Sequence, residues 1–197
     1  MRLLVLLAVA LTGCALTRNA PPLDVKYFDV EVPGTTTTHA ATIAPAPRAL
    51  ALGRVRSSEF LRNRIVHREG DVLGAYETAR WTEYPEAYLR RSLAHALFDE
   101  GRFAESLGRD VPTLDVELVA FEEVRKPHGR AGRVQVDYRL HAGDRVLASD
   151  VVTAEREASA EGGMPPVVDA LEAALAEVSA RIASGVDAAT RVTPSRP

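Results

Sequence analysis

The sequence predicts an α+β domain in which a single mixed, mostly antiparallel β-sheet carries two α-helices on one face. Segments with a strand-like alternation of apolar and polar residues follow one another in runs. Two further segments, residues 84–97 and 166–185, repeat apolar residues at helical spacing. Strands grouped in runs, with few helices between them, are typical of α+β folds.

The first residues have the features of an export signal. Arg2 precedes an apolar run, and the small residues Thr12 and Gly13 follow it immediately before Cys14. This order is typical of a secretory signal peptide. A buried or membrane-spanning helix is the alternative, but the run is shorter than the roughly 20 residues that a span requires. We therefore expect residues 1–13 to be removed on export.

Leu11, Thr12, Gly13 and Cys14 resemble the lipobox of bacterial lipoproteins. The resemblance implies that the Cys14 thiol receives a diacylglyceryl group and that cleavage frees its amine for a third chain. One chain holds a protein only marginally, at about 0.8 kcal/mol per buried methylene, whereas two or three chains give a persistent anchor. Ala15 stands where an Asp would retain a lipoprotein at the inner membrane. The resemblance therefore implies the periplasmic face of the outer membrane of a Gram-negative bacterium.

The chain between the anchor and the first helix is expected to be extended. Residues 14–24 would form the lipidated N-terminus and a linker, which reaches roughly 30 Å at most. Strands are predicted at residues 27–32 and 48–56, with a Thr-, Ala- and Pro-rich loop between them. Two β-prone runs, at 64–68 and 72–77, flank a Glu-Gly-Asp turn and predict a hairpin.

Two prolines and two glycines bound the predicted helices. Pro85 suits the first turn of the first helix, and Gly101 lies where its C-terminal cap would fall. Strands are then predicted at 114–119, 134–140 and 145–156, since apolar and polar residues alternate there.

Pro166 begins the last helix, and Gly185 is expected to end it. The domain would therefore occupy residues 25–186, and residues 187–197 would form a disordered tail.

Composition and missing motifs exclude several function classes. The chain has 1 Cys, so the fold must depend on its core rather than on disulfides, and its net charge of -3 gives no basic surplus for nucleic acid. No Gly precedes a Lys as a phosphate-binding loop requires, and the G-x-S-x-G nucleophile motif is missing. No His pair has the i, i+4 spacing of a helical metal site. We therefore expect no catalytic residues, no metal site and no cofactor.

Two charged groups have both a functional and a structural interpretation. Glu122 and Glu123 could be an acid–base couple, but adjacent strand residues point to opposite faces, which favours a solvated strand end. Arg62, Arg64 and Arg68 form the densest basic cluster. They would contact lipid headgroups or an acidic partner, or they would simply protect a solvated strand edge from aggregation.

Trp81, Tyr84 and Tyr88 are the aromatic residues with the clearest potential for partner contact. Trp and Tyr are enriched among the residues that dominate binding energy at interfaces. The alternative is that they close the core where the hairpin meets the first helix, and we favour this for Trp81.

Several segments in a fixed order carry a resemblance to a known family. They are the strand at 65–68 ahead of Tyr76, Trp81 and Pro85 before the helical segment 88–93, the strands 114–122 and 134–140, and the helix 170–185. In this order the chain resembles the auxiliary lipoproteins of ABC-type transporters, the PqiC-like family, over residues 27–185. The landmarks are core positions and include no catalytic signature.

The resemblance implies a non-enzymatic subunit at the outer-membrane end of an MCE-type lipid transport system. Its partners would be the MCE-type tunnel protein and, through it, an ABC permease and ATPase. Tethering raises the concentration of the domain at the membrane, where it would dock the tunnel. The usual symmetry of tunnel proteins would suit a homo-oligomer. Two alternatives stay open: a lipoprotein hydrolase acting on envelope material, and a generic outer-membrane assembly lipoprotein.

Overall fold

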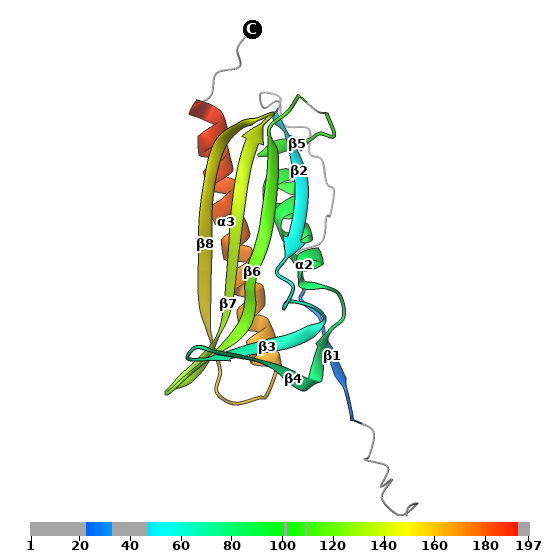
Figure 1. Cartoon of the computed structure of the whole chain (residues 1–197), viewed down its shortest axis with the longest axis vertical. Coiled ribbons are helices and arrows are strands. Elements are labelled where there is room, and N and C mark those ends of the chain that lie inside the picture. The colour runs from blue at the N-terminus through cyan, green and yellow to red at the C-terminus, as the bar shows by residue number, and fades with distance from the viewer. Residues whose placement is uncertain (1–22, 33–46, 101, 109, 193–197) are drawn as a thin grey trace, which may run out of the picture.

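The computed structural model describes residues 23–32, 47–100, 102–108 and 110–192 (Figure 1). The predicted signal peptide, the lipobox Leu11, Thr12 and Gly13, the acylation site Cys14, and Gly101 lie outside these residues. The described chain forms a mixed, mostly antiparallel eight-stranded sheet with two α-helices, which confirms the predicted α+β class.

The elements follow one another in the predicted order, with one short strand added. Their bounds are β1 (Lys26–Phe28), β2 (Arg48–Ser57), β3 (Arg64–Glu69), β4 (Val72–Trp81), α2 (Pro85–Ala94), the π-helical turn η2 (His95–Asp99), β5 (Phe103–Glu105), β6 (Thr113–Lys126), β7 (Gly129–Ala142), β8 (Arg145–Ala158) and α3 (Pro165–Val192). Strand β5 has no counterpart among the predicted strands, because three residues are too few to show an alternation.

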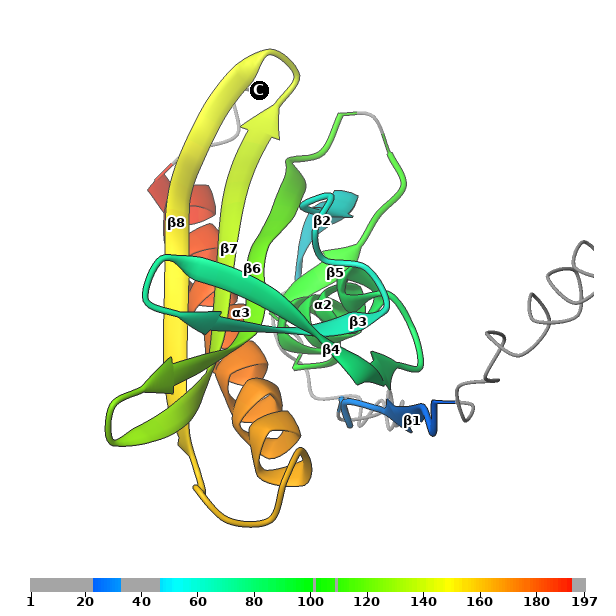
Figure 2. The same ribbon diagram turned by 60° about the horizontal axis from the view of Figure 1, so that its bottom comes forward.

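Strand β6 is the centre of the sheet, and two strands share one of its edges. Residues 113–118 pair in parallel with β2, and residues 122–125 pair in parallel with β3. Antiparallel β7 covers the other edge of β6, and β8 follows β7. The hairpin of β3 and β4 is confirmed, and β1 adds to β4 in parallel. Figure 2 shows this hairpin crossing the sheet at the end where β1 enters.

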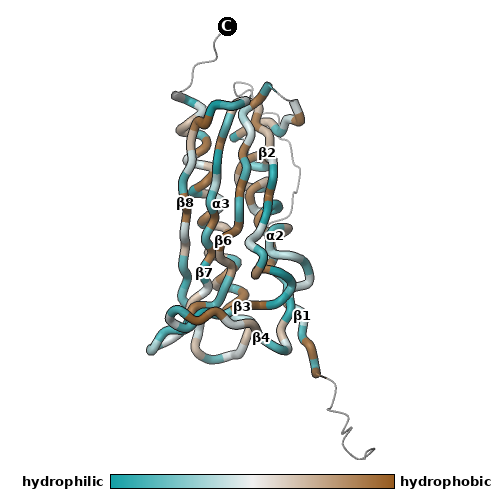
Figure 3. Tube along the Cα trace, in the orientation of Figure 1, coloured by the Kyte–Doolittle hydropathy of each residue, from teal (hydrophilic) through white to brown (hydrophobic). Residues whose placement is uncertain are grey.

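Both α-helices pack on one face of the sheet (Figure 1). The apolar positions of β6 and β7 alternate with polar ones, as the tube in Figure 3 shows, and the apolar set is buried against the helices. Helix α3 lies so close to β7 that a Cβ added at Gly132 would be 2.6 Å from the Leu171 amide nitrogen. The core therefore lies between the long strands and the two helices.

The last helix runs past Gly185, where the sequence predicts its end. Gly185 is not a cap: a Cβ there would lie 2.7 Å from the Tyr138 hydroxyl oxygen, so the missing side chain lets α3 pack on β7. Arg48 of β2 holds the additional turns through an ion pair with Asp187. Residues 187–192, which the sequence assigns to the tail, are therefore helical in the structure.

The first strand is shorter than the predicted segment 27–32, since β1 ends at Phe28. The Asp29 carboxylate accepts hydrogen bonds from the Val30 amide at 3.0 Å and from the Thr82 hydroxyl at 2.9 Å. A side chain that binds nearby backbone in this way competes with strand pairing. The chain after Asp29 instead leaves the sheet and buries Val30 in the core.

Candidate functional site

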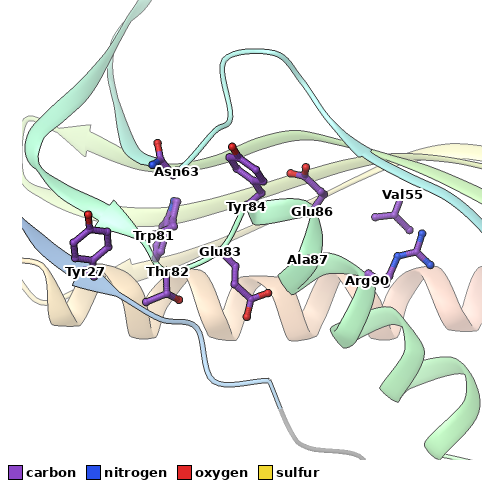
Figure 4. Close-up of a pocket in the computed structure, with 10 residues that line it drawn as sticks. All are labelled: Tyr27, Val55, Asn63, Trp81, Thr82, Glu83, Tyr84, Glu86, Ala87 and Arg90. Carbon is purple, nitrogen blue, oxygen red and sulfur yellow. The ribbon is translucent and has the colours of Figure 1, made fainter.

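A groove opens where β4 ends and α2 begins, at the end of the domain that β1 joins (Figure 4). Its volume is about 610 Å³. The side chains labelled in Figure 4 come from β1, β2, the loop before β3, the β4–α2 junction and the first turns of α2. The groove therefore depends on four stretches of the chain, at residues 27, 55, 63 and 81–90, which the fold brings together.

The floor of the groove is part of the core. The Trp81 ring packs against Phe121 and Tyr88, with ring centroids 5.2 and 6.0 Å apart. The Trp81 backbone amide donates a 2.7 Å hydrogen bond to the Asn63 carbonyl oxygen. Trp81 is buried, which confirms that it closes the core where the hairpin meets the first helix.

A hydrogen-bonded chain connects this floor to the segment after β1. The Thr82 hydroxyl donates to the Asp29 carboxylate and lies 2.9 Å from the Tyr88 hydroxyl, which must therefore be the donor of that pair. Burial raises the pKa of Tyr88, and the nearby Asp29 carboxylate adds to the effect. Burial acts to raise the pKa of Asp29 as well, but its hydrogen bonds outweigh burial and lower that pKa.

Charged side chains form the rim of the groove, and each is held by a partner. Glu86 accepts a 2.7 Å hydrogen bond from the Ser57 hydroxyl, and Arg90 donates a 3.2 Å hydrogen bond to the Gly53 carbonyl oxygen. Glu83 forms a 2.7 Å ion pair with an arginine of α2. An apolar floor with a polar rim is the usual composition of a binding surface.

The three aromatic residues predicted to contact a partner have different environments. Trp81 and Tyr88 are buried, because they fill the junction between the hairpin and α2, so their rings are core rather than contact surface. Tyr84 is 55% exposed and lines the groove. Tyr27, which is 66% exposed, lines the same groove from β1 (Figure 4). The predicted partner contact therefore rests on Tyr84, with Tyr27 beside it.

The sequence shows no signal for Tyr27, because its place depends on the pairing of β1 with β4. That pairing places Tyr27 directly opposite Arg80, a residue that is distant in the sequence. A pattern within one segment cannot reveal such a contact.

The structure corrects the expected surroundings of Glu122 and Glu123. Both residues are almost fully buried, at 1% exposure, rather than at a solvated strand end. Strands β3 and β7 pair with β6 on both sides at this point, which removes the edge. Glu122 forms ion pairs with Arg133 and, at 2.8 Å, with Arg68. Arg68 therefore neutralises a buried carboxylate and does not protect a free edge.

Glu123 belongs to a second buried cluster. It forms ion pairs with Arg125 at 3.2 Å and Arg130 at 3.5 Å, and it accepts a hydrogen bond from the Tyr76 hydroxyl. Burial and the bond to Glu123 raise the pKa of Tyr76. His67 meets the Tyr76 ring edge-on, and burial together with the charge of Arg125 lowers the pKa of His67. Both oxygens of Glu123 are engaged, so this cluster joins strands rather than offering a reactive group.

The described residues contain no group of three or more His, Cys, Asp or Glu side chains that could hold a metal ion. Within the same part of the chain, the helices are all too short or too polar to cross a membrane. The groove is concave, exposes aromatic side chains and carries charges of both signs on its rim, which are common features of surfaces that bind another molecule.

Comparison with known proteins identifies a matching family model. The model, described as ABC-type transport auxiliary lipoprotein component, matches residues 19–183. No curated protein matches the sequence.

Solved structures share the fold. A protein from Xanthomonas campestris has a TM-score of 0.69 at 19% identity, over 85% of this chain and 98% of its own. An uncharacterized protein has a TM-score of 0.63 at 19% identity, over 82% and 98%. A hypothetical protein from Chlamydia trachomatis has a TM-score of 0.52 at 9% identity, over 75% and 100%. At such identities the likeness concerns the fold alone.

Proposed function

The chain belongs to the family of ABC-type transport auxiliary lipoprotein components, and from this we propose that it is the membrane-anchored docking subunit of an ABC-type lipid transport system. An MCE-type tunnel protein carries lipid across the periplasm, and a separate permease and ATPase supply the energy. This domain performs no chemistry and holds the far end of the tunnel at the outer membrane. Acylated Cys14 is its anchor, and Ala15 directs it to that membrane.

One observation carries the docking role: the groove opens beside β1, the first strand after the linker. Tyr27 of β1 lines the groove, and β1 pairs with β4, whose last residue Trp81 forms the floor. The linker from Cys14 to Leu23 reaches at most roughly 30 Å, so the groove stays near the bilayer. A short tether also gives a partner bound in the groove a high effective concentration at the membrane.

The composition of the groove suits a protein partner. Tyr84 is exposed on its wall, and exposed aromatic side chains of this kind often dominate the energy of protein interfaces. The rim carries Glu83, Glu86 and Arg90, so it presents both signs of charge. Opposed charges on a rim select and orient a complementary protein surface.

Photo-crosslinking in the native envelope tests the docking role. A photoreactive amino acid replaces Tyr84 in one variant and Val146 in a control variant. Val146 has a similar exposure, 53%, and lies at the start of β8, at the opposite end of the sheet (Figure 1). We expect position 84 to trap an MCE-type protein, identified by mass spectrometry, and position 146 not to. The proposal fails if position 84 traps no transport component, or if both positions trap the same proteins.

A separate experiment tests the anchor. Cys14→Ser, expressed in the native host, should give soluble or unprocessed protein, because neither acylation nor lipoprotein-specific cleavage can then occur. Membrane fractionation measures this. A variant that still fractionates with the outer membrane would show that something other than the lipid holds the domain there.

A further inference from the structure

We infer that the anchored end of the domain is a membrane-contact surface that rests on an anionic phospholipid bilayer. We call it the membrane seat. It consists of three exposed apolar side chains and three cations: Leu23, Tyr27, Phe60, Lys26, Arg62 and Arg64. The inference rests on the proposed lipid anchor, and it adds a second, reversible contact with the same bilayer.

The exposed aromatic side chains of the described chain gather at this end. Phe60 is 49% exposed and lies three residues before Asn63 of the groove, in a turn that the Arg62 amide closes on the Phe60 carbonyl oxygen at 3.1 Å. The large apolar side chains exposed elsewhere in the described residues are Val and Leu. Aromatic rings that are exposed in water prefer the boundary between lipid headgroups and acyl chains.

The register of the small strands places basic residues beside these rings. Tyr27 is level with Arg80 across β1 and β4, and Arg80 is level with Arg64 across β4 and β3. Level residues on neighbouring strands project from the same face of a sheet. Tyr27 and Arg64 therefore share one outward face at the end where the anchor leaves the domain.

The cations of the seat are available to an external anion. Lys26, Arg62 and Arg64 are exposed, and none forms an ion pair with another described residue, whereas the arginines around Glu122 and Glu123 are all paired. Within residues 23–27 and 59–64, these three cations outnumber the two carboxylates, Asp24 and Glu59. Unpaired cations beside exposed rings match a surface of anionic headgroups over acyl chains.

The anchor holds this face near lipid. Leu23 is the first described residue, and its distance from acylated Cys14 is at most roughly 30 Å. A tether alone would let the domain turn freely. A seat that binds the bilayer would fix its orientation, so that the neighbouring groove opens along the membrane surface, where a docked tunnel could reach lipid.

Site-specific fluorescence on the mature, acylated protein tests the seat. Cys14 is the only cysteine, and acylation blocks its thiol, so one introduced cysteine can be labelled alone. Phe60→Cys and the control Val146→Cys have similar exposure, 49% and 53%. Each carries a polarity-sensitive dye in vesicles of phosphatidylethanolamine and phosphatidylglycerol that contain a lipid-borne quencher. We expect a blue shift and several times stronger quenching at position 60.

Charge variants test the electrostatic part. Arg62→Gln combined with Arg64→Gln should lower the ratio of seated to free domain about fivefold per charge, the factor expected for a basic residue at an anionic surface. Arg139→Gln combined with Arg145→Gln removes the same charge from exposed positions of β7 and β8 and should change the ratio little.

Three outcomes would overturn the seat. One is equal quenching at positions 60 and 146 in vesicles. Another is equal loss of quenching in the two charge variants. The third is shielding of position 60 only after a protein partner is added, which would make the surface a protein contact. None of these changes the cross-links expected from Tyr84, and a missing cross-link would not change the quenching, so the two proposals can fail separately.

Discussion

Gly132 on β7 is where the backbone of α3 meets the sheet, so Gly132→Ala tests how tightly the two layers are packed. The new Cβ would lie 2.6 Å from the Leu171 amide nitrogen and 2.8 Å from the Ala170 carbonyl carbon. Ordinary contact begins near 3.4 Å, so the helix would have to move by about 0.8 Å. Both atoms belong to helix backbone, which cannot rotate away as a side chain can.

The expected cost follows from this geometry. Overpacking a core costs about 1–3 kcal/mol, and the upper half applies here because a rigid helix of 28 residues must shift. Replacing Gly by Ala also restricts the unfolded chain, which offsets about 0.5 kcal/mol of the cost. The net loss in free energy of unfolding should therefore be about 2 kcal/mol. With a urea slope of about 2 kcal/mol per molar, the unfolding midpoint should fall by about 1 M.

Urea unfolding of the mature chain, followed by circular dichroism, measures this shift. Gly108→Ala is the matched control, because its Cβ would meet the Ser106 hydroxyl oxygen at 3.3 Å, on a side chain that can rotate, and the Val111 Cγ1 at 3.8 Å, an ordinary contact distance. The control should change the free energy of unfolding by less than about 0.5 kcal/mol. If Gly132→Ala unfolds at the same urea concentration as the control, the helix is not packed on β7 as described.

Three further predictions concern the core, the buried carboxylates and pH. Trp81→Ala should lower the free energy of unfolding by about 3–5 kcal/mol, measured by thermal denaturation, whereas Tyr84→Ala should change it by less than about 0.5 kcal/mol; equal effects would contradict the burial of Trp81. Glu123→Ala leaves its arginines without a counter-ion, and their partial exposure reduces the usual cost of a broken buried pair to about 2 kcal/mol. Glu117→Ala, at an exposed ion pair, should cost less than about 1 kcal/mol, and the reverse ranking would refute the cluster. Because burial lowers the pKa of His67 below 6.5, the unfolded state takes up its proton first, so stability should fall as the pH drops below that value. In urea unfolding between about pH 7.5 and about pH 5.5, His67→Gln should remove this part of the pH dependence of the free energy of unfolding. An unchanged pH dependence would be evidence against the lowered pKa of His67.

Local patterns predicted most of the fold because they arise within single segments. Leu114, Val116 and Leu118 alternate with polar residues whatever partner strand they meet, and the apolar stripe of 166–185 is helical in any context. The order of elements, the hairpin around Gly70 and the α+β class follow from such signals. The acylation signal at Cys14 is also local, and it stays a prediction for the experiment above.

Contacts between distant segments account for the errors. Gly185 has the composition of a helix end, but Tyr138 needs the space that its missing side chain leaves, so the helix continues. Glu122 and Glu123 have the composition of a solvated end, but two strands pair on either side of them and arginines neutralise them. In both cases the contact is made by other strands, which are separate segments of the sequence, so the local pattern of apolar and polar residues cannot reveal it.

The groove and the membrane seat could be found only in the folded chain. Tyr27 and Tyr84 are polar–aromatic residues with no pattern between them, and they line one groove only because β1 pairs with β4. Backbone hydrogen bonding between strands sets that pairing, and it depends on geometry rather than on the periodicity of either segment. Composition and spacing therefore specify which elements form, whereas packing decides which side chains meet and which stay buried.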